Sequence, residues 1–289
     1  MSKISVDKLS TPDGHSFEIR FPASFPIEKA SSVILVAPAL GAVAKAYDLL
    51  LLNFAKKGQL ALSFDLRGQG ASNFYPKPSV EFSYKEMLDY DFPALIEYIN
   101  KKYNVPVFLL GHSLGGQLFT LFSGVKRKEI KALLLITTCS VHYKGWDGYE
   151  KIKVLFFSQL FSVVASLLGY FPGNRFGFGG RTSKGVIKDW AHQARTGEYR
   201  ITNGSDNREK FLENVNLPVL SISFENDFLA PQKAVLNLLK KLPRAAVTHK
   251  HFDDCKLDHF SWLRRPALVV EEVIKYIRTL PEGDSEPRS

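Results

Sequence analysis

The stretch Leu109-Leu110-Gly111-His112-Ser113-Leu114-Gly115-Gly116 places a serine between two glycines, where an apolar run meets a helix-like run. A serine at a sharp strand-to-helix turn has a strained backbone, and the residues two before and two after it must lack bulk. Gly111 and Gly115 meet that requirement. Such a turn presents the Ser113 hydroxyl beside the free N–H groups of the following helix. The pattern predicts a nucleophilic serine, although the same spacing also occurs by chance in ordinary turns.

Buried strands and helical segments alternate on both sides of this stretch. Continuous apolar runs typical of strands in a parallel sheet occupy residues 33–37, 60–64, 105–110, 132–138 and 219–224, and residues 246–252 are expected to form a last strand. Helical periodicity covers residues 43–57, 82–103, 115–125, 231–242 and 266–280, with Pro93 kinking or dividing the second of these. Asp13-Gly14 joins two alternating segments into an opening hairpin. The alternation predicts an α/β fold.

A long interval interrupts this rhythm between the strands at 132–138 and 219–224. It spans about 80 residues, where a crossover needs far fewer. We therefore predict that residues 141–213, called the inserted segment below, form a helical cap. The cap would divide the α/β core into residues 1–140 and 214–280. Residues 281–289 have the composition of a disordered tail.

Residues 154–171 of the inserted segment contain no charged side chain. Their length is close to that of the shortest bilayer-spanning helices. Gln159, three serines and Gly169 argue against a membrane span. We favour a buried or acyl-lining lid helix, and a weak contact with a membrane surface remains as an alternative.

Composition limits the classes of protein that fit this sequence. The chain has 289 residues, a net charge of +9 and only two cysteines, so a secreted disulfide framework is not expected. The amino terminus lacks the apolar core of a signal peptide, and we expect a cytoplasmic protein. The basic residues are scattered apart from a modest cluster at 126–128, which favours solvated helix ends over a nucleic-acid site. No clustered set of metal ligands occurs.

An acid and a base follow the serine in the order expected for a Ser-Asp-His triad. Asp227 comes after the strand at 219–224, and His259 comes after the last strand. His259 would accept the serine proton, and Asp227 would fix the imidazole tautomer. Other acids and imidazoles lie nearby in the sequence and remain alternatives: Glu225, Asp253, Asp254, Asp258, His249 and His251.

These motifs resemble those of the α/β-hydrolase superfamily, in the branch of monoacylglycerol-lipase-like and serine-aminopeptidase-like enzymes. The segment from Asp65 to Ser72 is similar to the Asp-x-Arg-Gly-x-Gly-x-Ser segment of that branch, and the serine turn and ordered triad complete the likeness. Pro38-Ala39-Leu40-Gly41 and phrases at 168–173 and 189–190 look like a bacterial subgroup of predicted hydrolases. The resemblance implies an eight-stranded, mostly parallel sheet with flanking helices and no cofactor.

One departure from the family pattern concerns the oxyanion hole. Many relatives have His-Gly after the third strand, where this chain has Pro38-Ala39. Pro38 has no N–H to donate. We therefore expect Leu40 or Ala39 to donate together with Leu114, the residue after the serine. Asp65 and Arg67 are interpreted as structural loop anchors rather than a catalytic pair.

The aromatic inserted segment favours an ester substrate with an apolar acyl or alkyl group. Side chains that would line its pocket are His112, Trp146, Phe156, Phe157, Leu160 and Trp190. Hydrolysis of amides or peptides is the alternative reaction, and it would require acidic groups in the inserted segment to bind a substrate amine. A ligand-binding protein without catalysis is the alternative of another class. The sequence does not indicate the oligomeric state.

Overall fold

The computed structural model describes the chain apart from residues 1–2, 126–127, 203, 205–207 and 282–289. Two of the three residues in the basic cluster, and the predicted disordered tail from residue 282 onward, therefore lie outside the described residues.

Eight strands form one sheet in the order β1-β2-β4-β3-β5-β6-β9-β10. Their bounds are β1 Ile4–Ser10, β2 Ser16–Pro22, β3 Val33–Ala37, β4 Leu60–Phe64, β5 Val107–His112, β6 Ile130–Ile136, β9 Pro218–Phe224 and β10 Ala246–Phe252. The hairpin β1–β2 and the β2–β4 pair are antiparallel, and every other pair in this sheet is parallel. The predicted eight-stranded, mostly parallel sheet is confirmed.

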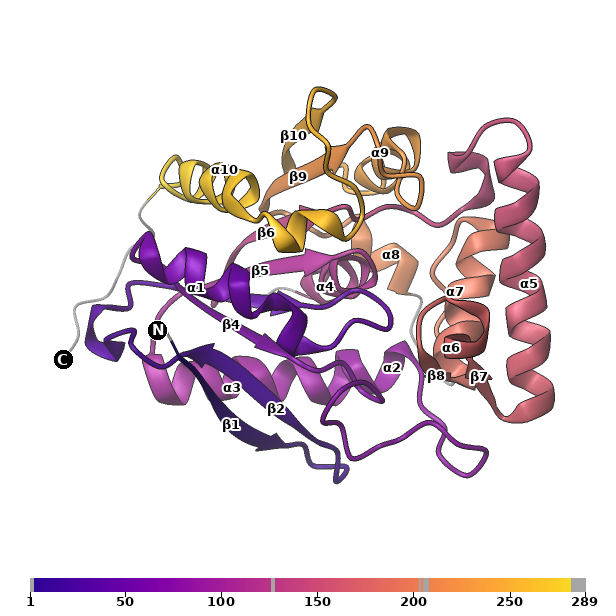
Figure 1. Ribbon diagram of the computed structural model, residues 1–289, viewed down its shortest axis with the longest axis horizontal. Helices are drawn as coiled ribbons and strands as arrows, with labels where there is room; N and C mark the ends of the chain where they lie inside the picture. Colours follow the sequence, from indigo (N-terminus) through magenta and orange to yellow (C-terminus); the bar gives the residue numbers. More distant parts are fainter. Residues whose placement is uncertain (1–2, 126–127, 203, 205–207, 282–289) are drawn as a thin grey trace.

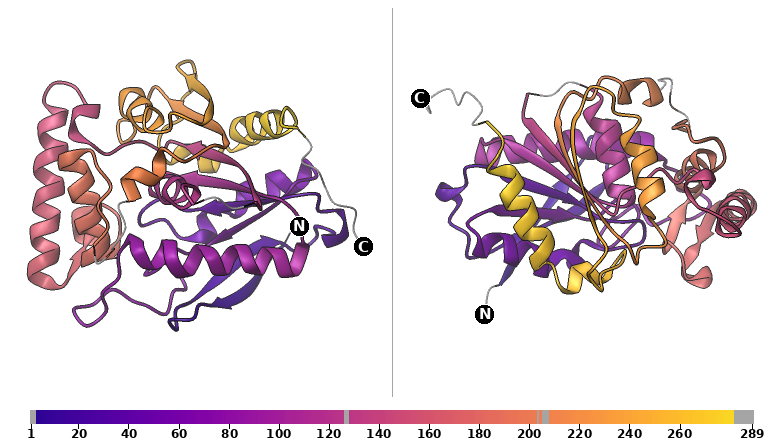
Figure 2. Two further views of the ribbon diagram at one scale, coloured as in Figure 1. Left: turned by 180° about the vertical axis from the view of Figure 1, so that it is seen from behind. Right: turned by 90° about the horizontal axis from the view of Figure 1, so that it is seen from above.

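Helices cover both faces of the sheet (Figures 1 and 2). Outside the inserted segment they are α1 Asp48–Lys56, α2 Tyr84–Glu86, α3 Phe92–Tyr103, α4 Leu114–Ser123, α9 Gln232–Leu239 and α10 Ala267–Ile277. Alternate residues of β3 face opposite sides, as the two-residue period of a strand requires. Val33 and Leu35 pack in the cluster that includes α3, α4 and α9, whereas Ile34 and Val36 pack with α1 and α10.

The region around Pro93 is one continuous helical stretch of mixed geometry. A π-helical turn at Met87–Asp91 separates α2 from α3, and Pro93 is the second residue of α3. A proline is tolerated in the first turn of a helix because its missing N–H would have no partner there. The irregular turn before Pro93 therefore divides the predicted helix at 82–103.

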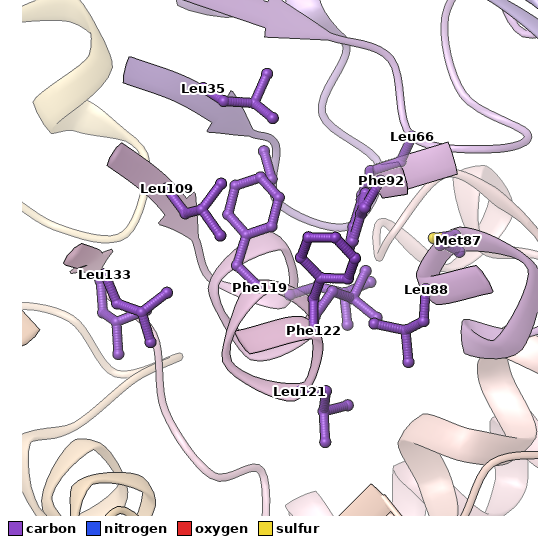
Figure 3. Packing of buried hydrophobic residues seen from close by; sticks show 14 of the residues in the cluster. Leu35, Leu66, Met87, Leu88, Phe92, Leu109, Phe119, Leu121, Phe122 and Leu133 are labelled. Atoms are coloured by element: carbon purple, nitrogen blue, oxygen red, sulfur yellow. The ribbon is translucent and has the colours of Figure 1, made fainter. Parts of the chain in front are cut away.

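Helix α4 is buried along its whole length. Phe119 and Phe122 extend from it toward Phe92 of α3, with ring centroids 5.0 and 5.4 Å from the Phe92 ring. Figure 3 shows these rings between Leu35 and Leu109 of the sheet and the residues of the α2–α3 region. This packing fixes the axis of α4, and therefore the position of the turn at its first residue.

The inserted segment lies between β6 and β9, beyond one end of the sheet (Figure 1). Its elements are a 3-10 turn at Tyr143–Gly145, α5 Glu150–Leu168, β7 Tyr170–Pro172, α6 Gly173–Phe176, β8 Arg181–Ser183, α7 Lys184–Thr196 and α8 Arg208–Leu212. The antiparallel pair β7–β8 forms a second, two-stranded sheet that a purely helical cap does not include.

Helix α5 is the outermost element of the inserted segment in both figures. Ser158, Phe161 and Ala165 are its buried residues, while much of its remaining surface is exposed. By length and composition this helix could cross a membrane. Only 17% of its most apolar 18-residue stretch is buried within the protein. The interpretation of residues 154–171 as a buried lid helix is therefore wrong, because α5 packs through one narrow stripe.

Candidate active site

Ser113 lies at the turn between β5 and α4. Its backbone has φ 53° and ψ −117°, a strained conformation for a residue with a side chain. A Cβ on Gly111 would overlap Gly116 of the helix, and a Cβ on Gly115 would overlap the carbonyl of Ala37 in β3. Both glycines are therefore required by close approach of backbones. The helix that starts at Leu114 directs its first N–H groups toward the serine.

Asp227 and His259 come together from the two loops that follow β9 and β10. His259 Nδ1 lies 2.9 Å from Asp227 Oδ2 and 3.1 Å from Oδ1. Asp227 is 1% exposed, and its Oδ1 also accepts the backbone N–H groups of Leu229 and Ala230. The carboxylate is thus fixed from two sides. Among the described residues, His259 Nε2 makes no hydrogen bond, so it is available to a substrate.

All three loops extend from the carboxyl ends of parallel strands, so the three side chains share one edge of the sheet. Ser113 is half-buried, and among the described residues its hydroxyl makes no hydrogen bond with His259. Catalytic hydrogen bonds are often long in unliganded enzymes and shorten when substrate binds.

A second constellation of serine, histidine and acid occurs nearby on β9 and β10. His251 Nδ1 lies 2.8 Å from Ser223 Oγ, and His251 Nε2 lies 2.9 Å from Glu225 Oε2. Ser223 is within a strand and 0% exposed, so no substrate can reach its hydroxyl. His249 joins the same group through Ser221. His249, His251 and Glu225, which were alternatives to His259 and Asp227, therefore form a structural cluster.

The loop that was expected to supply the oxyanion donors follows β3. Ala39 N–H donates a hydrogen bond to Tyr47 Oη at 2.9 Å, so this amide is already occupied. Ala39 is therefore wrong as an expected oxyanion donor. Within the described residues, the amide N–H groups of Leu40 and Leu114 donate no hydrogen bond. These two groups are available for a developing negative charge.

His112 was expected in the substrate pocket, but it is fully buried. Its Nδ1 lies 2.6 Å from Tyr47 Oη, and its Nε2 lies 2.8 Å from the carbonyl oxygen of His259. Burial lowers the pKa of the His112 imidazole well below its ordinary value of 6.5, and His259 lowers it further. No local pattern marks Tyr47 in the sequence, since its role depends on a partner 65 positions away.

A cavity of about 300 Å³ opens beside the Asp227–His259 pair. Its lining consists of Asn226, Asp227, Phe228, Leu229, Asp258, His259, Phe260, Ser261 and Arg264. Apolar surface from Phe228, Leu229 and Phe260 makes up one part of it, and Arg264 supplies a cation. Reasoning from the sequence identified Asp227 and His259, and named Asp258 as an alternative acid, but it missed the other lining residues.

The expected aromatic pocket residues do not line this cavity. Phe156, Phe157 and Leu160 lie on the exposed side of α5. Trp146 is 9% exposed and donates its indole N–H to the Phe228 carbonyl, so it supports the cavity wall from behind. Trp190 packs against Phe178 and belongs to the cluster that holds Leu40. The helical periodicity of α5 did not reveal which of its faces is covered.

Asp65 and Arg67 are not paired with each other. Asp65 accepts the backbone N–H groups of Ala44 and Ala71, and Arg67 forms ion pairs with Asp91 and Asp13. Both residues anchor loops, in agreement with their structural interpretation.

Comparison with known proteins identifies the family of this chain and supports its fold. The sequence model of the family described as "Serine aminopeptidase, S33" matches residues 28–177, just over half of the chain, and includes Ser113 but neither Asp227 nor His259. No curated protein matches the sequence.

Three solved structures illustrate the likeness of fold. DcsB, in complex with its substrate analogue, is 17% identical with a TM-score of 0.67, over 97% of this chain and 100% of its own. An esterase from Exiguobacterium antarcticum is 13% identical with a TM-score of 0.64, over 94% and 98%. The esterase Pf2001 from Pyrococcus furiosus is 14% identical with a TM-score of 0.62, over 96% and 92%. The chain belongs to the serine aminopeptidase S33 family of the α/β-hydrolase superfamily.

Proposed function

We propose that this α/β hydrolase is a serine esterase that cleaves a carboxylic ester with an apolar acyl or alkyl group. The observation that carries the proposal is the buried Asp227–His259 pair, at the same sheet edge as the strained Ser113 turn. A free hydroxyl is a weak nucleophile, and an imidazole oriented by a carboxylate supplies the base that it needs. The esterase neighbours agree with this chemistry but are too distant in sequence to assign it.

The proposed reaction proceeds through an acyl-enzyme. Ser113 Oγ attacks the ester carbonyl while His259 accepts its proton, and Asp227 stabilises the resulting imidazolium. The oxyanion receives hydrogen bonds from the N–H groups of Leu114 and Leu40. His259 then protonates the leaving alcohol. In the second half, His259 removes a proton from water, which attacks the acyl carbon and releases Ser113 and the carboxylic acid.

Three acids of the inserted segment already have partners within the protein, which favours an ester over a substrate with a free amine. Asp189 is buried and accepts hydrogen bonds from Tyr84 and Thr202. Glu150 pairs with Lys153 and Glu209 pairs with Lys241. These carboxylates are committed to partners within the protein, so they do not offer the amine site that aminopeptidase chemistry would need.

Fluorophosphonate labelling combined with two substrate panels tests the proposal. We expect the wild type to react with the probe, and to hydrolyse p-nitrophenyl esters of increasing chain length faster than aminoacyl p-nitroanilides. Ser113→Ala should lose both labelling and turnover. Ser223→Ala is the matched control, since it removes the serine of the second, buried constellation, and it should retain both. An unlabelled wild type would overturn the assignment, and faster anilide turnover would replace esterase with amidase activity.

We further propose that the exposed face of α5 contacts a membrane surface from which the apolar substrate is taken. Exposed large apolar residues on this helix are Ile152, Phe156, Phe157, Leu160, Val163, Leu167 and Leu168. They cover an arc wider than the two positions in seven of a coiled-coil seam, which favours a flat apolar medium over a single partner helix. Lys151 in the first turn, and Arg175 beyond the last, suit anionic headgroups.

Vesicle co-sedimentation tests this contact. The double variant Phe156→Ser/Leu167→Ser should bind vesicles of mixed zwitterionic and anionic lipid less than the wild type does, with unchanged turnover of a short soluble ester. Leu49→Ser/Leu236→Ser, which alters exposed leucines on α1 and α9, is the control and should bind as the wild type does. Equal binding by all three proteins would refute the contact. A dimer that dissociates only in the α5 variant would assign the face to a second copy of the chain.

A further inference from the structure

A buried polar chain connects three loops of the candidate site. Ala39 N–H donates to Tyr47 Oη at 2.9 Å, and Tyr47 Oη lies 2.6 Å from His112 Nδ1. His112 Nε2 lies 2.8 Å from the carbonyl oxygen of His259, which also accepts the indole N–H of Trp262 at 3.1 Å. The Tyr47, His112 and Trp262 side chains are fully shielded from solvent. No water is needed to complete the chain.

The first and last groups of this hydrogen-bonded series, the Ala39 amide and the His259 carbonyl, determine which atom carries the hydrogen in each bond between them. The His259 carbonyl can only accept, so His112 Nε2 carries a hydrogen. At the other end the Ala39 amide can only donate, so the Tyr47 oxygen accepts there and its own hydrogen is free for His112 Nδ1. Burial keeps His112 neutral and raises the pKa of the Tyr47 phenol, which keeps the hydroxyl protonated. The donors and acceptors are then all matched: Ala39 N–H donates to Tyr47, the Tyr47 hydroxyl donates to His112, and His112 donates to the His259 carbonyl.

Three members of this hydrogen-bonded series, Ala39, His112 and His259, are next to or part of a group with a role in the proposed reaction. Ala39 directly precedes Leu40, whose N–H is available for the oxyanion, and His112 directly precedes Ser113. The far end is the backbone of His259, the proposed base. Neither Tyr47 nor His112 lines the cavity beside the Asp227–His259 pair.

We propose that Tyr47 and His112 are positioning residues that hold the His259 backbone and the Ala39–Leu40 backbone in register with Ser113. This inference rests on the proposed esterase function. Removing either link leaves a buried polar group without a partner, and the loop that carries it must shift to regain one. A displacement of about 1 Å at reacting groups costs on the order of 10²-fold in rate. A neutral His112 is also needed because its ring centroid lies 5.1 Å from that of His259, which becomes positively charged during the reaction.

Four variants separate this role from general stability. Tyr47→Phe removes one hydroxyl oxygen. Tyr84→Phe is its matched control, because Tyr84 is equally buried and its hydroxyl has no hydrogen-bond partner among the described residues. His112→Gln keeps an N–H donor where His112 Nε2 reaches His259. His112→Asn keeps only the acceptor that faces Tyr47.

Active-site titration with a fluorophosphonate counts the competent serines, so that kcat is expressed per reactive site. We expect Tyr47→Phe and His112→Asn to lower kcat for a p-nitrophenyl ester by on the order of 10²-fold, with KM within about threefold. Tyr84→Phe should match the wild type, and His112→Gln should recover part of the kcat lost in His112→Asn. A merely structural role would reduce the number of titratable sites and leave kcat per site unchanged.

The outcomes distinguish the two proposals. An active wild type with equal kcat per site in Tyr47→Phe and Tyr84→Phe overturns the positioning inference alone. If Tyr47→Phe does not fold, equal kcat in the two His112 variants and the wild type overturns it instead. A wild type that neither takes the label nor hydrolyses any ester refutes the esterase proposal, and the positioning inference fails with it.

Discussion

Asp227 is held in place by contacts that an asparagine would preserve in part. Its Oδ1 accepts the backbone N–H groups of Leu229 and Ala230, whereas both oxygens face His259 Nδ1. In Asp227→Asn the amide oxygen can still accept from the two backbone groups. The amide NH₂ then faces the imidazole and favours the wrong tautomer.

We therefore expect Asp227→Asn to lower kcat by about 10⁴-fold with little change in the midpoint of urea unfolding. Glu225→Gln is the control, because Glu225 also contacts a histidine, His251, but its side chain is exposed and lies outside the proposed triad. It should leave kcat unchanged. A large loss of activity in Glu225→Gln, with a small one in Asp227→Asn, would transfer the role of the acid to Glu225.

At the same scale, the sequence predicted the residues whose identity follows from chain order and missed those that depend on side-chain contacts. Ser113 and Asp227 each follow a strand that a continuous apolar run identifies, and His259 follows the predicted last strand. Ala39 was expected to donate to the oxyanion, but its N–H is taken by Tyr47, eight positions later. No spacing rule predicts that a tyrosine from a 3-10 turn will reach this amide and a histidine of β5.

The inserted segment and the oxyanion loop are physically connected elements. The Leu40 side chain packs in the cluster of Phe161, Ala165, Phe171 and Ile187, which belongs to the inserted segment. A Cβ on Gly179 would lie 2.9 Å from Leu40 Cδ2, closer than side chains tolerate. The loop that includes Gly179 therefore packs directly against the side chain of Leu40, whose N–H is the proposed oxyanion donor.

Gly179→Ala tests this connection, with Gly177→Ala as the control. Both glycines have positive φ, +66° and +65°, so an alanine strains each backbone by a similar amount, about 1 kcal/mol. Only Gly179 has Leu40 within reach, because a Cβ on Gly177 meets nothing within 4 Å. Unfolding free energies measured in urea should fall by similar amounts. We expect kcat to fall by about tenfold in Gly179→Ala alone, if Leu40 supplies an oxyanion hydrogen bond. Equal kcat in both variants would contradict the connection.

Among the elements, the strands β3, β4, β5, β6 and β9 were predicted from continuous apolar runs, because a strand covered on both faces must be apolar throughout. The hairpin β1–β2 was predicted from alternating segments around Asp13-Gly14. The polar residues of β10 form no such run. The strands β7 and β8 were not predicted, since each has only three residues and no repeat of period two can be read from them. The length of α5 was predicted but its exposure was not. Apolar residues almost all round a helix normally indicate burial, and the sequence does not show which neighbours are absent.

For the whole molecule, the buried neutral His112 makes stability depend on pH. Its pKa in the folded state is depressed well below 6.5, while an unfolded chain titrates near that value. Below pH 6.5 the unfolded state therefore binds a proton that the folded state does not, and stability falls as pH falls. One such proton changes the free energy of unfolding by about 1.4 kcal/mol per pH unit.

Comparison of the wild type with His112→Asn isolates this contribution. Burial also lowers the pKa of His249, which adds to the same slope, whereas burial raises the pKa of Asp189 to about 6, which opposes it below that pH. Both groups are present in each protein, so the difference in slope belongs to His112. Urea unfolding measured from pH 7.5 to 5.5 should show a free energy that declines less steeply in the variant, by about 1.4 kcal/mol per unit below pH 6.5. Identical slopes would mean that His112 takes up a proton in the folded state in this range of pH. The hydrogen positions assigned to the hydrogen-bonded series from the Ala39 amide to the His259 carbonyl would then be wrong.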